Sequence, residues 1–152
     1  MSLKIRRATP GDIPCMVELL AQLFDQEVEF EADEVAQTIA LNMIMSDRDL
    51  GTIVVASRNG KCVGMVLMLY TVSTALGGRV AILEDTVVAE GERGTGIGGK
   101  IVEAAIDIAK HEGCKRITLL ADSVNVSAHR FYERIGFTRS AMVPFRLHIS
   151  DD

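Results

Sequence analysis

Hydrophobic and polar residues repeat with two different periods along the chain, and the change of period separates predicted helices from predicted strands. Residues 3–8, in which apolar and basic residues are mixed, are predicted to form a first strand. After it, Thr9, Pro10 and Asp12 form a typical helix start, in which Thr9 caps the first turn and Asp12 returns the cap. The helix is predicted from apolar residues three or four positions apart, namely Ile13, Val17, Leu20 and Phe24.

The next part of the chain changes from helical to alternating spacing. A second helix is predicted from residue 33 to about residue 45, and the acidic segment 26–31 before it is expected to be a loop. Residues 52–58 and 61–71 are rich in strand-forming residues, and they flank Asn59-Gly60, a strong signal for a hairpin turn. The small-residue turn at 73–78 leads to a further strand at 79–88, so three consecutive antiparallel strands are expected.

Helical spacing returns after the third of these strands. Apolar residues from Ile97 to Ile108 predict an amphipathic helix that starts near Gly96 and ends near Gly113. A buried strand at 116–121, a short helix at 127–135 stopped by Gly136, and a final strand pair within 141–149 complete the pattern. The order β-αα-βββ-α-β-α-ββ predicts an α/β fold of the α+β type with a mixed sheet, and residues 1–152 are expected to form a single domain.

Composition and charge exclude several classes of protein. With 48% hydrophobic and 24% charged residues, the chain has the composition of a globular domain. A net charge of −5 argues against a polyanion-binding surface, so nucleic acid is not expected as a partner, whereas a cationic substrate would be tolerated. The longest apolar run, residues 62–72, is too short to cross a bilayer, and the N-terminus lacks the apolar stretch of a signal peptide. We therefore expect a cytoplasmic protein without a membrane partner.

Cysteine and histidine usage points to no metal site. The three cysteines, Cys15, Cys62 and Cys114, have an odd count and no paired spacing, which favours reduced thiols. No cluster of Cys or His has the spacing of metal ligands, so no metal is predicted. His111 and His129 are expected on the surfaces of helices.

Glycines are concentrated in residues 91–99, between the strand at 79–88 and the next helix. Glycine allows close approach of the backbone, and the first amides of a helix have no partner within it, so this segment predicts a pocket for a diphosphate. Gly94-x-Gly96-x-x-Gly99 satisfies the dinucleotide fingerprint, with Asp122 near the position of a ribose-binding acid. Against that interpretation, the loop is long, it lies in mid-chain, and only one βαβ unit follows.

The same loop also has the form Arg93-x-x-Gly96-x-Gly98, and a second block follows after one strand. This block is Asn125-x-x-Ala128-x-x-Phe131-Tyr132-x-x-x-Gly136-Phe137. In both blocks and in their order the chain resembles the GNAT superfamily of N-acetyltransferases. The resemblance covers residues 80–137, whereas the first 50 residues match only in the order of elements. It implies the GNAT acyl-coenzyme A N-acyltransferase fold, with acetyl-coenzyme A as cosubstrate.

The resemblance also implies a binding site for acetyl-coenzyme A, because the family holds the pyrophosphate on backbone amides of this loop. The implied residues are Val87, Val88, Arg93, Gly94, Thr95, Gly96, Ile97, Gly98, Gly99, Asn125 and Tyr132. Lys100 is a further candidate as a charge partner. Asn125 has two open roles, a helix cap or a hydrogen bond to the pantetheine arm, and one residue could serve both.

Two residues are candidates for proton transfer. The family places the tyrosine at Tyr132 near the coenzyme A sulfur, where its hydroxyl could protonate the departing thiolate; packing beside Phe131 is the alternative. A carboxylate would help the acceptor, because an alkylammonium with a pKa of about 10.4 is almost wholly protonated at neutral pH. Glu84 is preferred to its neighbour Asp85 as this base, since the family's glutamate on this strand aligns with it, although pairing with a basic residue is its other reading.

The sequence therefore predicts an enzyme that moves acetyl from acetyl-coenzyme A to a primary amine of a small molecule or peptide, by direct attack in a ternary complex. The alternative is a non-catalytic acyl-coenzyme A-binding or sensing domain. The acceptor would be selected by the two N-terminal helices, the loop at 73–78 and the final strands. Candidate residues, chosen by location alone, are Tyr70, Arg79, Phe145 and Arg146. The acceptor and the oligomeric state, monomer or homodimer, are left open.

Overall fold

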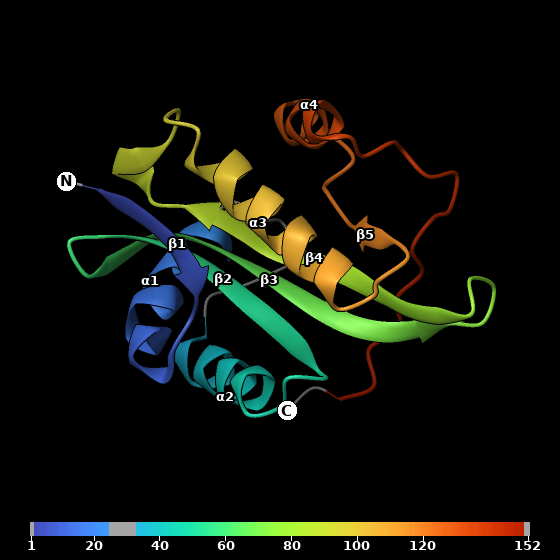
Figure 1. Cartoon of the computed structure of the whole chain (residues 1–152), viewed down its shortest axis with the longest axis horizontal. Coiled ribbons are helices and arrows are strands. Elements are labelled where there is room, and N and C mark those ends of the chain that lie inside the picture. Colours follow the sequence, from blue (N-terminus) through green and yellow to red (C-terminus); the bar gives the residue numbers. More distant parts are fainter. Residues whose placement is uncertain (1, 25–32, 151–152) are drawn as a thin grey trace.

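A five-stranded mixed sheet forms the centre of the protein in the computed structural model, which describes residues 2–24 and 33–150 (Figure 1). The strands lie in the order β1 (Leu3–Arg7), β2 (Gly51–Arg58), β3 (Lys61–Ser73), β4 (Gly78–Val88) and β5 (Ile117–Leu119). β1, β2, β3 and β4 pair in antiparallel fashion with one another, and β5 is parallel to β4. The α/β class with a mixed sheet is therefore confirmed.

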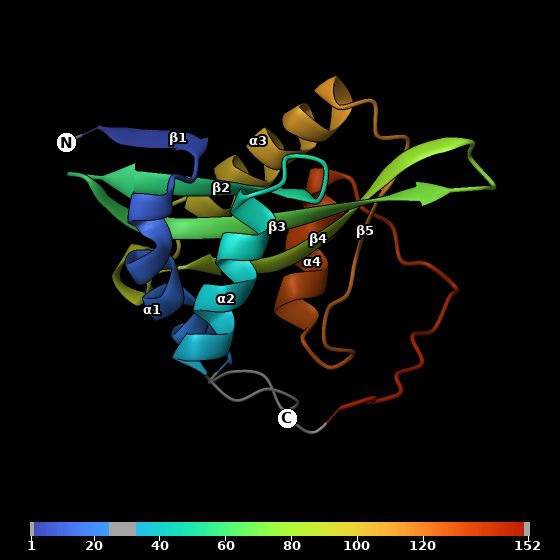
Figure 2. The same cartoon turned by 90° about the horizontal axis from the view of Figure 1, so that it is seen from below.

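Two helices cover each face of the sheet, as both views show (Figures 1 and 2). The four helices are α1 (Ile13–Phe24), α2 (Glu34–Met45), α3 (Ile97–His111) and α4 (Val126–Ile135). Successive residues of a strand point to opposite faces, so Val55 and Met65 lie in the cluster under α1 and α2, whereas Val54 and Val66 lie in the cluster under α3 and α4. Because helices cover both faces of the sheet, the central strands β2 and β3 are buried on both sides, and both pairs of helices pack on them.

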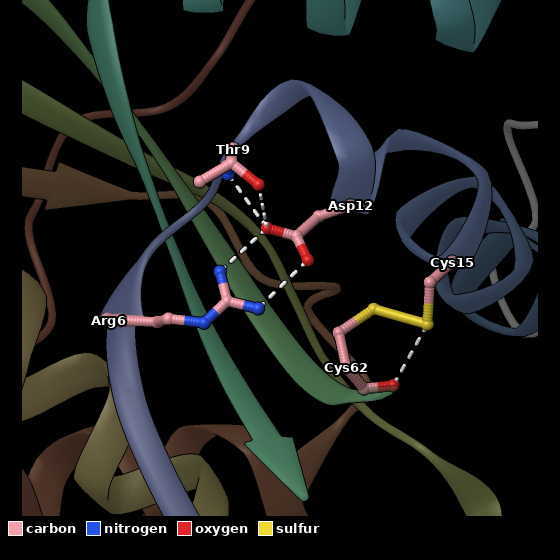
Figure 3. The surroundings of a disulfide bond; sticks show 5 residues. All are labelled: Arg6, Thr9, Asp12, Cys15 and Cys62. Carbon is pink, nitrogen blue, oxygen red and sulfur yellow. Dashed lines mark hydrogen bonds and ion pairs between the residues drawn. A yellow bond between two sulfur atoms is a disulfide. The ribbon is translucent and has the colours of Figure 1, made fainter. Parts of the chain in front are cut away.

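The predicted start of the first helix is confirmed. The Thr9 amide donates to Asp12 Oδ2 at 2.7 Å, and a 3-10 turn (Pro10–Asp12) leads into α1. Arg6 on β1 donates two further hydrogen bonds to the same carboxylate, at 2.7 and 2.9 Å (Figure 3). The hydrogen bonds from Arg6, aided by those from Thr9, lower the pKa of Asp12 to about 2.

The prediction of reduced thiols is wrong for two of the three cysteines. Cys15 in α1 and Cys62 at the start of β3 form a disulfide, with their Cα atoms 6.1 Å apart (Figure 3). The two residues are separated by 47 positions in sequence, and they meet because α1 packs across β3. Cysteine spacing carries no signal for a pair that only tertiary packing brings together. Cys114 is a free, half-buried thiol.

The hairpin predicted at Asn59-Gly60 is confirmed, with φ of 56° and 76° at the two residues, as a type I′ turn requires. The expected loop at 26–31 lies outside the described residues. Within the described chain, no helix is long and apolar enough to span a membrane.

The C-terminal part of the prediction fails. The strand expected at 116–121 is shortened to β5, and the strand pair expected at 141–149 is absent, because these residues have no regular structure. The alternation of apolar residues indicated a tendency to form a strand, but a strand also needs another strand to pair with, and the sheet of the described chain ends at β5 without including this segment.

Candidate active site

β5 ends partway along β4, and the divergence of the chain beyond its last residue is the centre of the candidate site. Their parallel pairing joins Ala81, Ile82 and Leu83 to Ile117, Thr118 and Leu119, and there it ends. β4 runs on to Val88, whereas the chain after Leu119 turns towards α4 without pairing. We call this divergence the β4–β5 split; the parallel ladder between the two strands does not continue beyond Leu83.

A β-bulge in β4 lies directly beside the split. The register between β3 and β4 shifts between the pairs Leu67–Glu84 and Met65–Val87, so Asp85 and Thr86 stand opposite a single residue. Asp85 has a φ of 54°, in the left-handed region that non-glycine residues seldom adopt. The bulge therefore interrupts the regular ladder at the level where β5 ends.

The glycine loop joins the end of β4 to α3 through a second 3-10 turn (Glu90–Glu92). Gly94 and Gly96 have φ of 80° and 85°, and Gly96 is the residue that precedes the helix. In the described structure, none of the backbone amides of residues 94–99 donates a hydrogen bond. Six consecutive unused amides beside the positive end of a helix are donors of the kind that can bind an anion such as a diphosphate.

Side chains hold this loop in place. The Nε of Arg93 donates to the carbonyl of Val88 at 3.1 Å, and the Thr95 hydroxyl donates to the carbonyl of Glu92 at 2.6 Å. Ile97, the first residue of α3, is buried in the cluster between this helix and the sheet, which anchors the start of the helix. Arg93 and Lys100 are both exposed, so their charges are accessible to a ligand at the loop.

Gly98 differs from the other loop glycines because it faces another helix. A Cβ built on Gly98 would lie 3.3 and 3.4 Å from two ring atoms of Phe131 in α4, and 3.6 Å from a methyl of Val88. A Cβ on Gly99 or Gly96 would meet nothing within 4 Å. The absence of a side chain at Gly98 thus allows α4 to approach α3, a role that the sequence motif did not reveal.

Tyr132 lies on α4 next to that contact. Its ring packs edge-on against Phe131 and Phe137, with centroids 4.9 and 5.7 Å away. Burial raises the pKa of Tyr132, and a hydrogen bond with the Thr86 side chain opposes this shift by a smaller amount. The phenol is therefore held against the bulged part of β4 and stays protonated through neutral pH.

Asn125 caps α4, since its side-chain oxygen accepts from the Ala128 amide at 3.0 Å. The capping role is thus realised, and it leaves the NH2 of the side chain for another partner. His129, expected on the surface, is half-buried and joins the carbonyl of Asp122 to Arg139, at 2.8 and 3.0 Å. Asp122 therefore takes part in an interaction within its own segment.

Glu84, on β4, and Tyr132, on α4, lie on opposite faces of the sheet. Glu84 pairs across the ladder with Leu67, which belongs to the cluster under α1 and α2, and its side chain is exposed on that face. Tyr132 packs with the cluster under α3 and α4. The two side chains can act on one substrate only where the sheet is open, at the β4–β5 split.

The residues named as acceptor candidates are not gathered at this split. Tyr70 is buried with its hydroxyl 2.6 Å from Thr52 Oγ1, and the Arg79 guanidinium stacks over its ring at 4.9 Å. Arg79 also forms ion pairs with Asp49 and Glu112, at the opposite end of β4 from the glycine loop. Phe145 is exposed on the C-terminal segment.

Sequence reasoning missed three features of the site. Thr86, the partner of Tyr132, carried no motif signal. The bulge at Asp85 left only a weak trace in the sequence. Strict alternation would place Val87 on the same face as Ala81 and Leu83, but Val87 lies in the cluster on the opposite face. The contact between Gly98 and Phe131 joins two motif residues, but spacing alone does not show that they touch.

The β4–β5 split lies beside a row of free amides. This combination suits an acyl-coenzyme A, because the amides can take the diphosphate and the split can take the long thiol arm. The chain belongs to the acetyltransferase (GNAT) family, whose sequence model matches residues 15–137. It is thus an acetyl-coenzyme A-dependent acetyltransferase, as the motifs predicted.

The chain is similar to two proteins named as N-acetyltransferases and to a solved structure with another description. The N-acetyltransferase YhfO of Bacillus subtilis, itself uncharacterized, is 30% identical over 89% of both chains. Aminoalkylphosphonate N-acetyltransferase of Salmonella typhimurium is 26% identical over 90% of this chain and 86% of its own. A crystal structure from Bacillus halodurans, described as a transcriptional regulator, is 31% identical with a TM-score of 0.82, and the match covers 97% of this chain and 100% of that one.

Proposed function

We propose that this protein transfers the acetyl group of acetyl-coenzyme A to a primary amine of a small molecule or peptide, by direct attack within a ternary complex. The observation that carries the proposal is the row of unused amides at residues 94–99 next to the β4–β5 split. The name of the Salmonella relative, which specifies an aminoalkylphosphonate, supports a small amine as the acceptor class. Residues 1–152 would act as a single domain, and a cytoplasmic location stays a prediction.

In this proposal the glycine loop binds the cosubstrate. The amides of residues 94–99 donate to the diphosphate, and Arg93 and Lys100 contribute positive charge. The side-chain NH2 of Asn125, which its capping bond leaves over, donates to the pantetheine arm. Val87 and Val88 border the arm along β4.

The chemistry then takes place at the split. Glu84 accepts a proton from the ammonium, so that the neutral nitrogen can attack the acetyl carbonyl. A backbone amide of β4 near the bulge donates to the oxygen on which negative charge develops, because the ladder there is interrupted. The carbon–sulfur bond breaks after the carbon–nitrogen bond has formed, and Tyr132 donates its proton to the departing thiolate. The second proton, which the attacking nitrogen loses as it becomes an amide nitrogen, returns through water to the Tyr132 phenolate. The raised pKa of Tyr132 favours this role, since the phenol carries its proton at the pH of the reaction.

The test compares the only two tyrosines of the chain. In Tyr132→Phe we expect kcat to fall by about 100-fold, the size of a lost general acid, with the Kd for acetyl-coenzyme A nearly unchanged. Thiol release with a panel of amines measures kcat, and calorimetry measures Kd. Tyr70→Phe is the matched control, because its hydroxyl bonds to Thr52 away from the split and kcat should be retained. A Tyr132→Phe variant with the kcat of the wild type at neutral and alkaline pH would reduce Tyr132 to a packing residue.

A further inference from the structure

The β-bulge changes the face of the sheet on which Thr86 lies. Leu83, before the bulge, belongs to the cluster under α3 and α4. In a regular strand Val87 would share this face, and Thr86 would lie on the other face together with Glu84. Val87 instead lies in the cluster under α1 and α2, because the register of β4 shifts at Asp85. The shift therefore places Thr86, the neighbour of Val87, on the face that α4 covers.

The packing around Gly98 brings Thr86 next to Tyr132. A Cβ built on Gly98 would lie 3.3 Å from the ring of Phe131 and 3.6 Å from a methyl of Val88, so these two side chains lie close together. Thr86 precedes Val88 by two positions on β4, and the Tyr132 ring lies 4.9 Å from that of Phe131. The hydrogen bond between the Thr86 side chain and the Tyr132 phenol agrees with this placement.

The effect of this hydrogen bond on Tyr132 shows which group donates. Burial raises the pKa of Tyr132, and the hydrogen bond with Thr86 lowers it by a smaller amount. A hydrogen bond lowers the pKa of a phenol when it stabilises the phenolate, which has no proton to donate. The Thr86 hydroxyl is thus the donor and the phenol oxygen the acceptor, so the proton of the phenol is left for another acceptor.

We propose that Thr86 is a positioning residue for the reaction, because its hydroxyl donates to the phenol oxygen of Tyr132 and directs the phenol proton toward the thiol sulfur at the β4–β5 split. This inference rests on the acid role of Tyr132 proposed above. Thr86 keeps its own proton throughout. Tyr132 gives its proton to the departing thiolate, and the phenolate oxygen accepts the hydrogen bond from Thr86 until a proton returns through water. The bulge thereby links the break in the ladder to the orientation of the acid.

A titration tests the hydrogen bond without any catalysis. The chain has two tyrosines and no tryptophan, so in a Tyr70→Phe background the ultraviolet absorbance of tyrosinate reports Tyr132 alone. In this background we expect Thr86→Val to raise the pKa of Tyr132, because the phenolate loses its donor, and Thr86→Ser to restore it. Valine is close to threonine in shape and is a good strand former, so the fold should be retained. An unchanged pKa in Thr86→Val would overturn the proposal.

Kinetics test the role of the hydrogen bond in the reaction. Thr86→Val should lower kcat by about 3- to 10-fold, the net effect of one hydrogen bond, and Thr86→Ser should recover most of it. The Kd for acetyl-coenzyme A should be unchanged in both variants. Thr71→Val is the matched control, because Thr71 lies on β3 opposite Val80, away from the split, and its kcat should be that of the wild type. A loss of acetyl-coenzyme A affinity at unchanged kcat would show that Thr86 contacts the cosubstrate, and the proposal would be wrong.

A double-mutant cycle shows whether Thr86 acts through Tyr132. In a Tyr132→Phe background, Thr86→Val should change kcat by less than about 2-fold, because the phenol through which it acts is already gone. An equal loss of kcat in both backgrounds would contradict the positioning role. The two proposals also fail differently. A Tyr132→Phe variant with the kcat of the wild type refutes the acid role and, with it, the positioning of its proton. A large loss in Tyr132→Phe with a wild-type kcat in Thr86→Val refutes only the positioning.

Discussion

Adjacent glycines in the first turn of α3 allow the contact between α3 and α4 to be tested by a matched pair of substitutions. In Gly98→Ala the new methyl lies 3.3 Å from the ring of Phe131, whereas in Gly99→Ala it meets nothing within 4 Å. Both changes remove the conformational freedom of a glycine from the same helical turn. The difference between the two variants therefore isolates the packing of α4 on α3.

The expected magnitudes follow from two opposing effects. Alanine in place of glycine in a helix increases the free energy of unfolding by about 0.5–1 kcal/mol, and Gly99→Ala should show this gain alone. At Gly98 the Phe131 ring must move by a few tenths of an ångström, and forcing a methyl into a packed contact costs about 1–3 kcal/mol. Gly98→Ala should consequently be less stable than Gly99→Ala by about 1–3 kcal/mol, a difference in Tm of roughly 3–9 °C for a chain of this length.

Thermal and urea denaturation measure this difference, and thiol release adds a functional readout. Phe131 packs 4.9 Å from the ring of Tyr132, so a shift of α4 displaces the proposed acid and should lower kcat in Gly98→Ala. The reasoning is refuted if Gly98→Ala stabilises the protein as much as Gly99→Ala does. A loss of acetyl-coenzyme A affinity in Gly98→Ala without any loss of stability would instead return Gly98 to the diphosphate role alone.

Two further predictions concern carboxylates. In Glu84→Gln, the rising limb of kcat/KM with pH should move to higher pH, because the ammonium loses its base. The control Asp85→Asn, a change that the left-handed φ tolerates, should leave the limb in place. If Asp85→Asn moves the limb and Glu84→Gln does not, the base is Asp85. Asp12→Asn should lower the free energy of unfolding at pH 7 by about 1–2 kcal/mol, a value reduced for the partial exposure of Arg6. The folded pKa of Asp12 is about 2 against an ordinary 3.8, so this contribution is complete above about pH 4 and is lost as the pH falls towards 2. Urea titrations of both proteins at pH 7 and pH 2 check it, and an equal difference at the two pH values would contradict it.

The parts of the fold that sequence predicted well are those determined by local chemistry. Asn59-Gly60 adopts positive φ at both residues, which few other pairs allow, so the hairpin could be read directly. The return bond from Asp12 to the Thr9 amide spans three residues and depends on no distant contact. The loop at 94–99 was also predictable, because glycines before a helix leave amides free regardless of the surrounding fold.

The parts that sequence missed depend on contacts between distant segments. The disulfide joins Cys15 to Cys62 only after α1 has packed on β3, and no spacing rule anticipates that. The strand pair expected at 141–149 is absent, because alternation of side chains does not supply the neighbouring strand that pairing needs. A pattern of side chains indicates what a segment can form, and the rest of the structure decides whether it does.

The proposed chemistry depends on one of these missed features. Tyr132 came from the second motif and Glu84 from the strand before the glycine loop, yet an unbroken sheet would keep the two side chains on separate faces with no common substrate. The bulge at Asp85 and the end of β5 at Leu119 fall at the same level of the sheet, and together they open it between the two faces. In the proposed mechanism, a base on one face can then act on the amine nitrogen while an acid on the other face acts on the thiol sulfur. The proposed pairing of Glu84 with Tyr132 therefore depends on the break in the sheet more than on either side chain alone.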